Sequence, residues 1–399
     1  MNKYITSKKH KTTNYFKSSV VTATVLLSST MLNAQTVLSD VEVIEKTEKV
    51  DYTQNYKVDK SSSSKVTQDL VDTPQTISVI TKKVMEEQQS TTLVEALRNT
   101  PGITLNLGEN GNTNAKDNIN MRGFDAQGSI YKDGIRDLAN SSKDTFNTEA
   151  VEVTKGAVGA DNGRGVSSGY INQVTKSAKN IDEVAGTVGY STAKNARLTS
   201  DINKKINETT GVRLNVMKQD GEVAGRDEVE IDRTGIAGSV AFGIGTATRT
   251  TINYEHTEQD DVPDGGIPTV GLNGGAVKAD TSKFYGSSDD FEEAKSDAFT
   301  IKFEQDISDN TIFKNTSRYA KTNQEMLLTS PFNYDTTAST VDRRMHARWQ
   351  ENEILTNQSN FTTQIQTGML LHKISTGIEL TKESQLTKNY TAQTAQVTS

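Results

Sequence analysis

The sequence predicts a small α+β domain followed by an antiparallel transmembrane β-barrel, and three observations support this prediction. Residues 66–178 mix helical and strand patterns, and the loops between them are dense in Asn, Asp, Gly and Ser. After residue 180 the helical signal disappears, and apolar side chains alternate with polar or small ones in segments of about ten residues. The N-terminus has the pattern of an exported protein.

Residues 1–34 have the order of a secretory signal peptide. They carry five lysines and no acidic residue, then a short apolar stretch from Val20 to Leu27, then small and polar residues that end at Ala34. An amphipathic anchor is the alternative, but about 8 apolar residues are too few to span a bilayer. Cleavage after Ala34 leaves 39 basic against 51 acidic residues, a net charge of −12. Such an exported acidic chain is not expected to bind nucleic acid.

Composition excludes several classes of protein. The chain has no run of about 20 apolar residues, which a helical membrane protein needs. It has no cysteine, so disulfide scaffolds, thiolate metal sites and cysteine nucleophiles are excluded. The four histidines have no spacing that would form a metal site: His10, His256, His346 and His372. We therefore expect neither a zinc enzyme nor a hydrolase triad.

Residues 35–65 are predicted to form a polar linker with one extended island. The island is Asp40-Val41-Glu42-Val43-Ile44-Glu45, in which β-prone residues alternate with acids. It suits a strand that adds to the sheet edge of another protein, and an ordinary β-prone piece of linker is the alternative. The serine run at 61–64 is predicted to be a flexible link.

Within residues 66–178 the local signals predict one helix and several strands. Thr76 to Ile80 is predicted as a strand. Thr92 and Glu95 form a capping box before an apolar helical stretch, and the pair Pro101-Gly102 ends that helix. Further strands are predicted at 118–122, 130–132, 151–155 and 171–175.

The alternating segments after residue 180 indicate about ten strands. A soluble β-sandwich also alternates, but long segments, an export signal and tyrosines near strand ends favour the barrel. These tyrosines are Tyr190, Tyr254 and Tyr319. All five prolines are predicted to lie outside strands, because proline cannot donate to a strand ladder. They are Pro74, Pro101, Pro263, Pro268 and Pro331.

Seven sequence pieces, in this order, resemble the plug domain of TonB-dependent outer-membrane receptors. They are DTPQTISVI (72–80), LVEALRNTPGIT (93–104), MRGF (121–124), YKDGIRD (131–137), VEVTKG (151–156), GRG (163–165) and GYINQVTK (169–176). Downstream, DVPDGGIP (261–268) and TGIEL (376–380) look like barrel features of siderophore receptors. Within that branch, RGFDAQ (122–127) and the Asp-Gly-Gly loop most resemble catecholate siderophore receptors.

The resemblance implies a signal peptide at 1–34, a TonB box and linker at 35–65, a plug domain at 66–178 and an incomplete barrel at 179–399. It implies a receptor in the outer membrane that imports ferric siderophores, with no catalytic residue, no cofactor and no metal site. Its partners would be TonB with its inner-membrane energising complex, the ferric siderophore and outer-membrane lipid. The TonB box would comprise Asp40, Val41, Glu42, Val43, Ile44 and Glu45.

Polar plug loops are the predicted siderophore site, because ferric catecholates are anionic and favour cationic and amide groups. The candidates are Asn112, Asn114, Lys116, Gln127, Ser142 and Lys143. Arg122 and Lys155 are predicted to lock the plug to the barrel. The family commonly has Arg-Gly-Pro where this chain has Lys155-Gly156-Ala157, and lysine cannot fork onto a carboxylate, so that lock should be weaker.

The same sequence features leave two other functions open. Another cargo (haem, cobalamin or an oligosaccharide) would keep the same motifs, and a non-transporting surface protein would share only the strands. For haem, His256 is the plausible histidine, but it is predicted at a strand end.

The glycines at 163–169 do not form a dinucleotide fingerprint. A barrel that holds a plug has about 22 strands, so the chain is expected to be a fragment or truncated frame.

Overall fold

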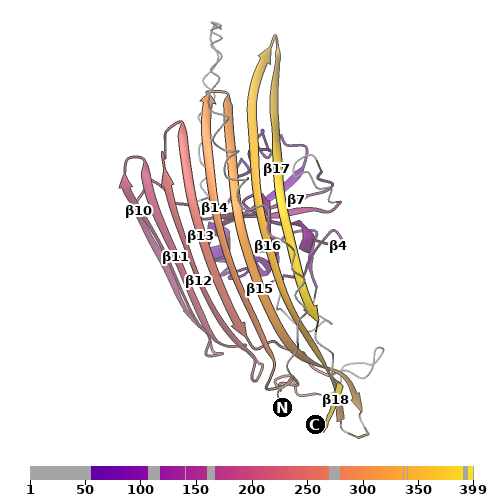
Figure 1. The fold of residues 1–399 in the computed structure, drawn as a ribbon. Helices are drawn as coiled ribbons and strands as arrows, with labels where there is room; N and C mark the ends of the chain where they lie inside the picture. The colour runs from indigo at the N-terminus through magenta and orange to yellow at the C-terminus, as the bar shows by residue number, and fades with distance from the viewer. Residues whose placement is uncertain are drawn as a thin grey trace, which may run out of the picture. The chain divides into compact units, whose positions relative to one another are not determined.

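The computed structural model describes residues 55–106, 117–139, 141–159, 167–268, 279–335, 337–338, 340–389 and 394–398 (Figure 1). These residues all belong to one compact unit, Glu45–Ser399. The predicted signal peptide and the predicted TonB box at residues 40–45 lie outside the described residues. So do three predicted siderophore contacts, Asn112, Asn114 and Lys116.

The α+β domain contains two small sheets and two short α-helices. The five-stranded sheet has the order β1-β7-β8-β5-β6, and the three-stranded sheet has the order β2-β3-β4. The elements are β1 (Thr76–Thr81), α1 (Lys82–Glu87), α2 (Leu93–Leu97), β2 (Ile103–Leu105), β3 (Ile119–Met121), β4 (Phe124–Asp125), the 3-10 turn η3 (Gln127–Ser129), β5 (Ile130–Lys132), β6 (Ile135–Arg136), β7 (Thr148–Lys155) and β8 (Gly169–Thr175).

Helix α2 begins with the predicted capping box. The Thr92 hydroxyl accepts from the Glu95 backbone N–H at 3.3 Å, and the Glu95 carboxylate accepts from the Thr92 N–H at 3.2 Å. Helix α1 was not predicted, because it is only six residues long and buries only Lys82 and Met85, which is too little to produce a helical period.

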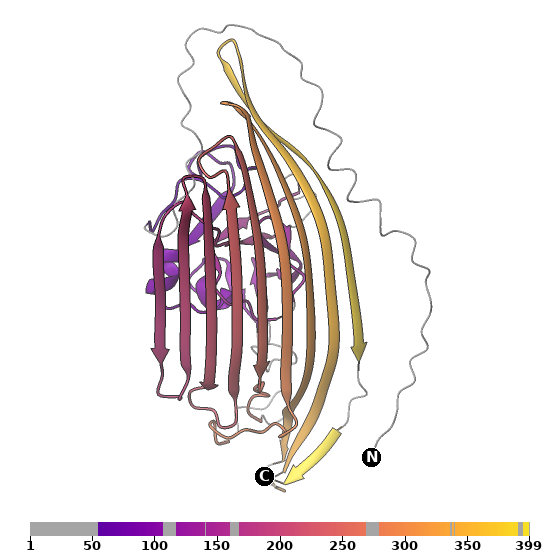
Figure 2. The same cartoon turned by 60° about the vertical axis from the view of Figure 1, so that its left-hand side comes forward.

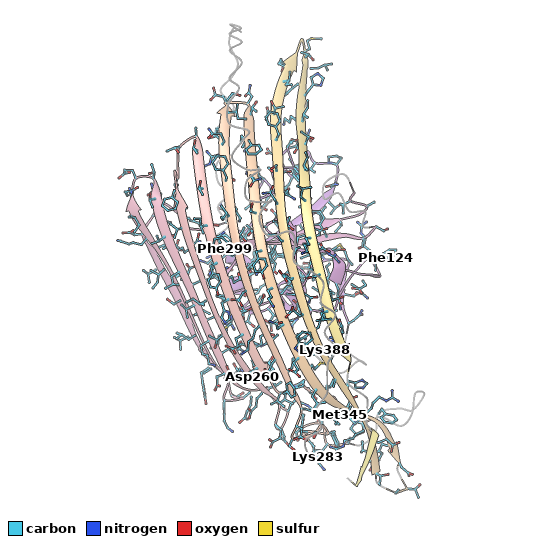
Figure 3. All side chains as sticks on the ribbon, in the orientation of Figure 1. Phe124, Asp260, Lys283, Phe299, Met345 and Lys388 are labelled. Atoms are coloured by element: carbon cyan, nitrogen blue, oxygen red, sulfur yellow. The ribbon has the colours of Figure 1, made fainter. Side chains whose placement is uncertain are left out.

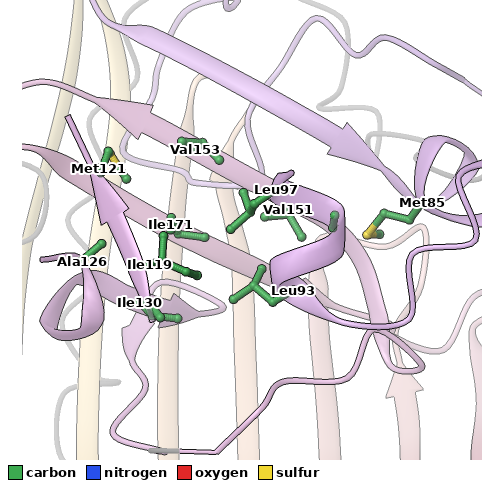
Figure 4. Packing of buried hydrophobic residues seen from close by; sticks show 11 residues of the cluster. Met85, Leu93, Leu97, Ile119, Met121, Ala126, Ile130, Val151, Val153 and Ile171 are labelled. Carbon is green, nitrogen blue, oxygen red and sulfur yellow. The ribbon is translucent and has the colours of Figure 1, made fainter. Parts of the chain in front are cut away.

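The hydrophobic core of this domain lies between α2 and the sheets (Figure 4). Leu93 and Leu97 of α2 are fully buried against a cluster that includes Val151 and Val153 of β7 and Ile171 of β8. Burying a leucine contributes about 2 kcal/mol. This core therefore orients the polar side chains on the remaining surface of the domain.

The second half of the chain forms one antiparallel sheet, whose strands follow one another in sequence order from β9 to β17, while β18 pairs with β16 (Figures 1 and 2). The strands are β9 (Glu183–Tyr190), β10 (Ala196–Asn207), β11 (Thr210–Glu222), β12 (Glu230–Phe242), β13 (Thr248–Asp261), β14 (Phe291–Ser308), β15 (Thr311–Asp335), β16 (Thr340–Thr367), β17 (Leu370–Asn389) and β18 (Thr394–Thr398). Neighbour-to-neighbour antiparallel pairing is the barrel topology that the alternation predicted.

The alternation is weaker in β10 and β15 than in the other strands, for a physical reason. Strand β10 exposes Leu198, Ile202 and Ile206 on one face, but Lys204 interrupts this apolar series. Strand β15 exposes Tyr319 on one face but buries Met326 and Leu328 on the other, so its apolar side changes along its length. A single period-2 pattern does not describe such a strand.

The prediction that all prolines lie outside strands is wrong for Pro331. Pro331 lies inside β15, where the register with β16 shifts between Pro331 and Asn333. Such an irregularity accommodates a residue that has no N–H to donate. The serine run at 61–64, predicted to be a flexible link, instead donates hydrogen bonds to Glu152.

The sheet has one polar and one apolar face. Side chains such as Asp201, Arg213 and Gln259 are buried against the α+β domain. The opposite face exposes apolar side chains at alternate positions, among them Val188, Leu214, Ile236, Phe299, Ile301, Leu355 and Ile378. In the described residues no helix is long and apolar enough to cross a membrane.

Aromatic residues form a cross-strand row on the apolar face. Tyr254 pairs with Phe299, and Phe299 pairs with Tyr319 on the next strand. The prediction of tyrosines near strand ends is confirmed for Tyr190, the last residue of β9. Tyr254 and Tyr319 lie within their strands, which run on beyond the row. Figure 3 shows Phe299 midway along the sheet, with Asp260 and Lys388 nearer one end. An aromatic row that borders polar positions is typical of a membrane interface.

Candidate functional site

The candidate site is the polar surface between the α+β domain and the inner face of the sheet. Its most buried part is a group of charged residues that we call the Arg213 cluster, which comprises Lys82, Glu149, Lys176, Lys179, Asp201 and Arg213. Four of these residues belong to the α+β domain and the segment that leaves it, whereas Asp201 and Arg213 belong to β10 and β11.

Arg213 is at the centre of the cluster. Its side chain is fully buried, and it forks onto Asp201 with Nε–Oδ1 and Nη2–Oδ2 distances of 2.7 Å each. Its Nη1 donates to Glu149 Oε2 at 3.1 Å. A guanidinium can bridge two carboxylates in this way because its donors have a fixed planar geometry. One sheet residue is thus bonded to the α+β domain and to its own neighbour strand.

Three lysines surround the same two carboxylates. Lys176 Nζ is 2.9 Å and Lys82 Nζ is 3.3 Å from Asp201 Oδ2, and Lys179 Nζ is 2.8 Å from Glu149 Oε1. Burial acts to raise the pKa of the Glu149 carboxyl, but Arg213 and Lys179 outweigh it and hold that pKa below its ordinary value. Burial lowers the pKa of the Lys176 ammonium, and Asp201 only partly offsets this effect.

A second group of contacts joins the loop before β7 to strands β10 and β13. Arg197 forks onto Asp144 with Nη1–Oδ2 and Nη2–Oδ1 distances of 2.8 and 2.7 Å. Glu255 accepts from Lys132 and, at 2.5 Å, from Asn147 Nδ2. These contacts extend the attachment of the α+β domain to the middle of the sheet.

Later strands contact the domain through β5, β6 and their turn. Lys302 of β14 is 3.0 Å from Asp133, and Arg136 is 3.0 Å from Glu383 of β17. Burial acts to raise the pKa of Asp133, but the Lys302 ammonium and the hydrogen bonds from Thr175 together outweigh it, so that this pKa lies below its ordinary value. The ion pairs therefore reach from β10 to β17.

One apolar contact fits between these polar groups. Phe146 is buried and packs with Met217 and Ala237 of the sheet. A Cβ at Gly235 would lie only 2.7 Å from the Phe146 ring, so the glycine makes room for it. This is the type of close approach for which glycine is needed.

A pocket with about 560 Å³ of empty space, part of it open to solvent, lies between the domain and strands β11–β15. Its lining includes two predicted siderophore contacts, Ser142 and Lys143, and two sheet arginines, Arg233 and Arg318. Ser142 is buried, and its carbonyl accepts from Gln259 Nε2 at 2.6 Å. The structure therefore brings two predicted residues to a polar pocket whose lining also includes the carboxylates of Asp137, Asp144, Glu255 and Glu258.

Lys143 is already engaged within the domain. Its ammonium donates to the Ala139 carbonyl at 2.9 Å and is 3.7 Å from Asp117 Oδ2, and its backbone N–H donates to the same oxygen at 3.0 Å. Burial raises the pKa of Asp117 to about 6 despite the lysine. Gln127, a further predicted contact, donates to Asn118 Oδ1 at 2.5 Å and does not line the pocket.

The two predicted lock residues lie beside each other. Arg122 is exposed, with φ of 52°, and its Nη1 lies 3.8 Å from where a Cβ on Gly156 would be, next to Lys155. Burial and then the Arg122 charge lower the pKa of Lys155. Within the described ranges neither side chain forms an ion pair with a carboxylate.

Sequence reasoning missed the residues of the Arg213 cluster. A signal for them exists, because Asp201 and Arg213 are charged residues at the alternate positions of a strand that face away from the apolar side. That signal identifies polar inward positions but not their partners, since Glu149 is 64 residues away from Arg213 in sequence.

Comparisons with known proteins agree with this architecture. The family model for the TonB-dependent Receptor Plug Domain matches residues 69–170. The chain is 41% identical over 352 residues to the catecholate siderophore receptor Fiu of Escherichia coli K12, across 83% of this chain and 46% of that protein. It is 37% identical over 342 residues to the probable TonB-dependent siderophore receptor PiuA of Acinetobacter baumannii, with the same coverage.

Solved structures show the same likeness. The closed-form crystal structure of the E. coli ferric-catecholate import receptor Fiu matches with a TM-score of 0.78 and 40% identity, over 84% of this chain and 50% of that one. The crystal structure of PiuA from A. baumannii matches with a TM-score of 0.79 and 35% identity, over 85% and 49%. The chain spans about half the length of the curated relatives it matches. With its plug domain and its partial barrel of antiparallel strands, the chain belongs to the TonB-dependent receptors.

Proposed function

We propose that the protein imports ferric siderophores of the catecholate type across the outer membrane. The observation that carries this proposal is the 41% identity to a catecholate siderophore receptor, which extends over 83% of this chain. The polar attachment of the plug to the inner face of the sheet supports transport over a purely structural surface role, because a surface strand protein has no need of a plug.

The proposed organisation follows the sequence prediction. Residues 1–34 serve as a signal peptide, and residues 35–65 carry the TonB box (Asp40 to Glu45) and a linker. TonB, energised by its inner-membrane complex, pairs with the box as an added strand. The plug comprises residues 66–178. Residues 179–399 form barrel strands whose apolar face contacts outer-membrane lipid, and the row of Tyr254, Phe299 and Tyr319 supports this.

The predicted siderophore contacts remain predictions: Asn112, Asn114, Lys116, Gln127, Ser142 and Lys143. Two of them, Ser142 and Lys143, line one pocket together with Arg233 and Arg318. Arg233 is bonded to Asp261, so an anionic chelate would compete with that carboxylate for its donors. Lys143 would bind a ligand only after releasing Ala139 or Asp117. Arg122 and Lys155 likewise remain proposed lock residues, which need carboxylate partners on the barrel.

Haem is not favoured as the cargo. His256 lies within β13 on the same face as Tyr254, and its Nδ1 is 2.9 Å from Asp297 Oδ1. That face is turned away from the plug, so this histidine does not face an incoming ligand.

The test is uptake of radiolabelled iron by iron-starved cells that carry the native gene and lack other catecholate receptors. We expect uptake of iron from a ferric monocatecholate, and its loss in Val43→Pro, because proline cannot donate to an added strand. Thr47→Pro, in the same linker but outside the box, is the matched control and should keep uptake. Equal uptake in Val43→Pro and Thr47→Pro, or uptake of haem but not of the catecholate, would refute the proposal.

A further inference from the structure

The segment that precedes the plug strands is docked on the five-stranded sheet. Val58 is 7% exposed and packs with Ala150 of β7, in a cluster completed by Leu70, Val79 and Val174. Farther along, the carbonyl of Ser64 accepts from the Thr362 hydroxyl of β16 at 3.2 Å. Residues 58–64, which lie between the predicted TonB box and the plug strands, are therefore packed against the rest of the protein.

A single buried carboxylate fixes the middle of this segment. Glu152 of β7 is 2% exposed. Its Oε1 accepts from the Ser62 backbone N–H at 2.6 Å, and its Oε2 accepts from the Ser62 hydroxyl at 2.9 Å. The Ser61 hydroxyl is 3.2 Å from both carboxylate oxygens. Donors from two consecutive serines thus converge on one side chain.

The carboxylate is held in position from the opposite side. Asn172 of β8 donates from Nδ2 to Glu152 Oε2 at 3.2 Å, and its own Oδ1 accepts from the Gly134 N–H at 2.9 Å. Asn172 is itself buried. The sheet therefore provides a preformed acceptor, and the serine segment supplies donors that can leave.

We propose that Glu152 is a latch that keeps residues 57–66 docked on the plug. Hydrogen bonds to an ionised group are stronger than neutral ones, and a buried carboxylate that loses its donors must take up water instead. Undocking therefore requires release at Glu152, and the apolar contact of Val58 opens with it. If the proposed function holds, pulling on the TonB box acts along the chain against this latch.

The experiment uses the absence of native cysteine. A Val58→Cys reporter in the native protein, in isolated outer membranes without the inner-membrane complex, is labelled with a membrane-impermeant maleimide. Adding Glu152→Gln removes the charge from the acceptor, and we expect the reporter thiol at position 58 to be labelled about tenfold faster or more. Glu87→Gln is the matched control. Glu87 accepts at 2.7 Å from Tyr56, which directly precedes the segment, but in an exposed position, so its loss should change labelling less than about twofold.

A second reporter separates undocking from unfolding. Ala96 lies in the buried core of the plug at 3% exposure, so the thiol of Ala96→Cys should stay protected in the Glu152→Gln background. Unchanged labelling of the thiol at position 58 overturns the latch. Fast labelling of the thiol at position 96 also overturns it, because Glu152 would then support the whole plug. These readouts require no transport, so a failure of siderophore uptake with the expected labelling would refute only the proposed function.

Discussion

The Arg213 cluster and the Arg122–Lys155 pair both place cations on the plug or against it, but only the cluster gives them carboxylate partners. Arg213 is fully buried between Asp201 and Glu149. Arg122 is exposed, and its charge acts on another cation, Lys155. Within the described contacts Arg122 and Lys155 therefore do not attach the plug to the sheet. The attachment comes from Glu149 and from residues of other plug motifs, such as Asp133, Arg136 and Lys176.

The difference has an electrostatic cause. A buried charge is tolerated only when it is paired and hydrogen-bonded, so removing one partner leaves the other uncompensated. An exposed charge is solvated by water and loses little when a neighbour is removed. The two sites should therefore respond very differently to the same substitution.

The largest effect is expected for Arg213→Ala. It leaves Asp201 and Glu149 without their guanidinium, although Lys82, Lys176 and Lys179 remain, and should lower the free energy of unfolding by about 4 kcal/mol. Arg122→Ala is the matched control, with an expected change within about 0.5 kcal/mol. Urea titration of the purified protein, followed by protease resistance of the plug, measures both. Equal losses of unfolding free energy in the two variants would contradict the proposed difference between the buried cluster and the exposed pair.

A smaller effect should come from the buried pair of Asp117 and Lys143. Burial raises the pKa of Asp117 from 3.8 to about 6. Between these values the folded protein binds more protons than the unfolded chain, so this residue makes the free energy of unfolding fall as the pH rises through that window. The loss should be about 3 kcal/mol and complete above the folded pKa.

Comparison with Asp117→Asn isolates this contribution, because Glu149 and Asp133 have lowered pKa values and change stability in the opposite direction. The stability of the parent relative to Asp117→Asn should decrease between about pH 4 and pH 6. Guanidinium titrations at several pH values provide the measurement. If the free energies of unfolding of the parent and of Asp117→Asn change in parallel with pH, Asp117 keeps an ordinary pKa, and burial does not raise it.

The smallest effect tests the apolar part of the same attachment. Gly235→Ala places a Cβ at 2.7 Å from the Phe146 ring, and the displacement should cost about 1 kcal/mol. Gly238→Ala, on the same strand, meets no atom within 4 Å and should be nearly neutral. Thermal melts monitored by circular dichroism compare the two. A more stable Gly235→Ala protein would mean that Phe146 does not pack against this glycine.

Local signals predicted much of the fold. The capping box at Thr92 and Glu95 and the strand at β1 are confirmed, since both depend on neighbouring residues only. The alternation is less clear in β10, where Lys204 interrupts the apolar face, and in β15, where the apolar side changes along the strand. Pro331 was misplaced because a register irregularity depends on the partner strand and not on the local sequence.

The candidate site was less predictable than the fold. Ser142 and Lys143 were chosen as polar loop residues able to contact a ligand, yet both are buried, and Lys143 contacts Asp117 from an earlier loop. Glu152 belongs to a plug motif, but nothing local indicates that Ser61 and Ser62 are its donors. Both contacts join segments far apart in sequence.

The sequence by itself determined the order of the domains, the alternation that makes one sheet face apolar, and the family, because these properties are encoded in residue types and short spacings. Only the tertiary structure decided which charges pair. Arg213 meets Glu149, and Ser62 meets Glu152, through strand register and domain docking. Charge pairing acts over a few ångströms in space, and the fold alone sets which distant residues come that close.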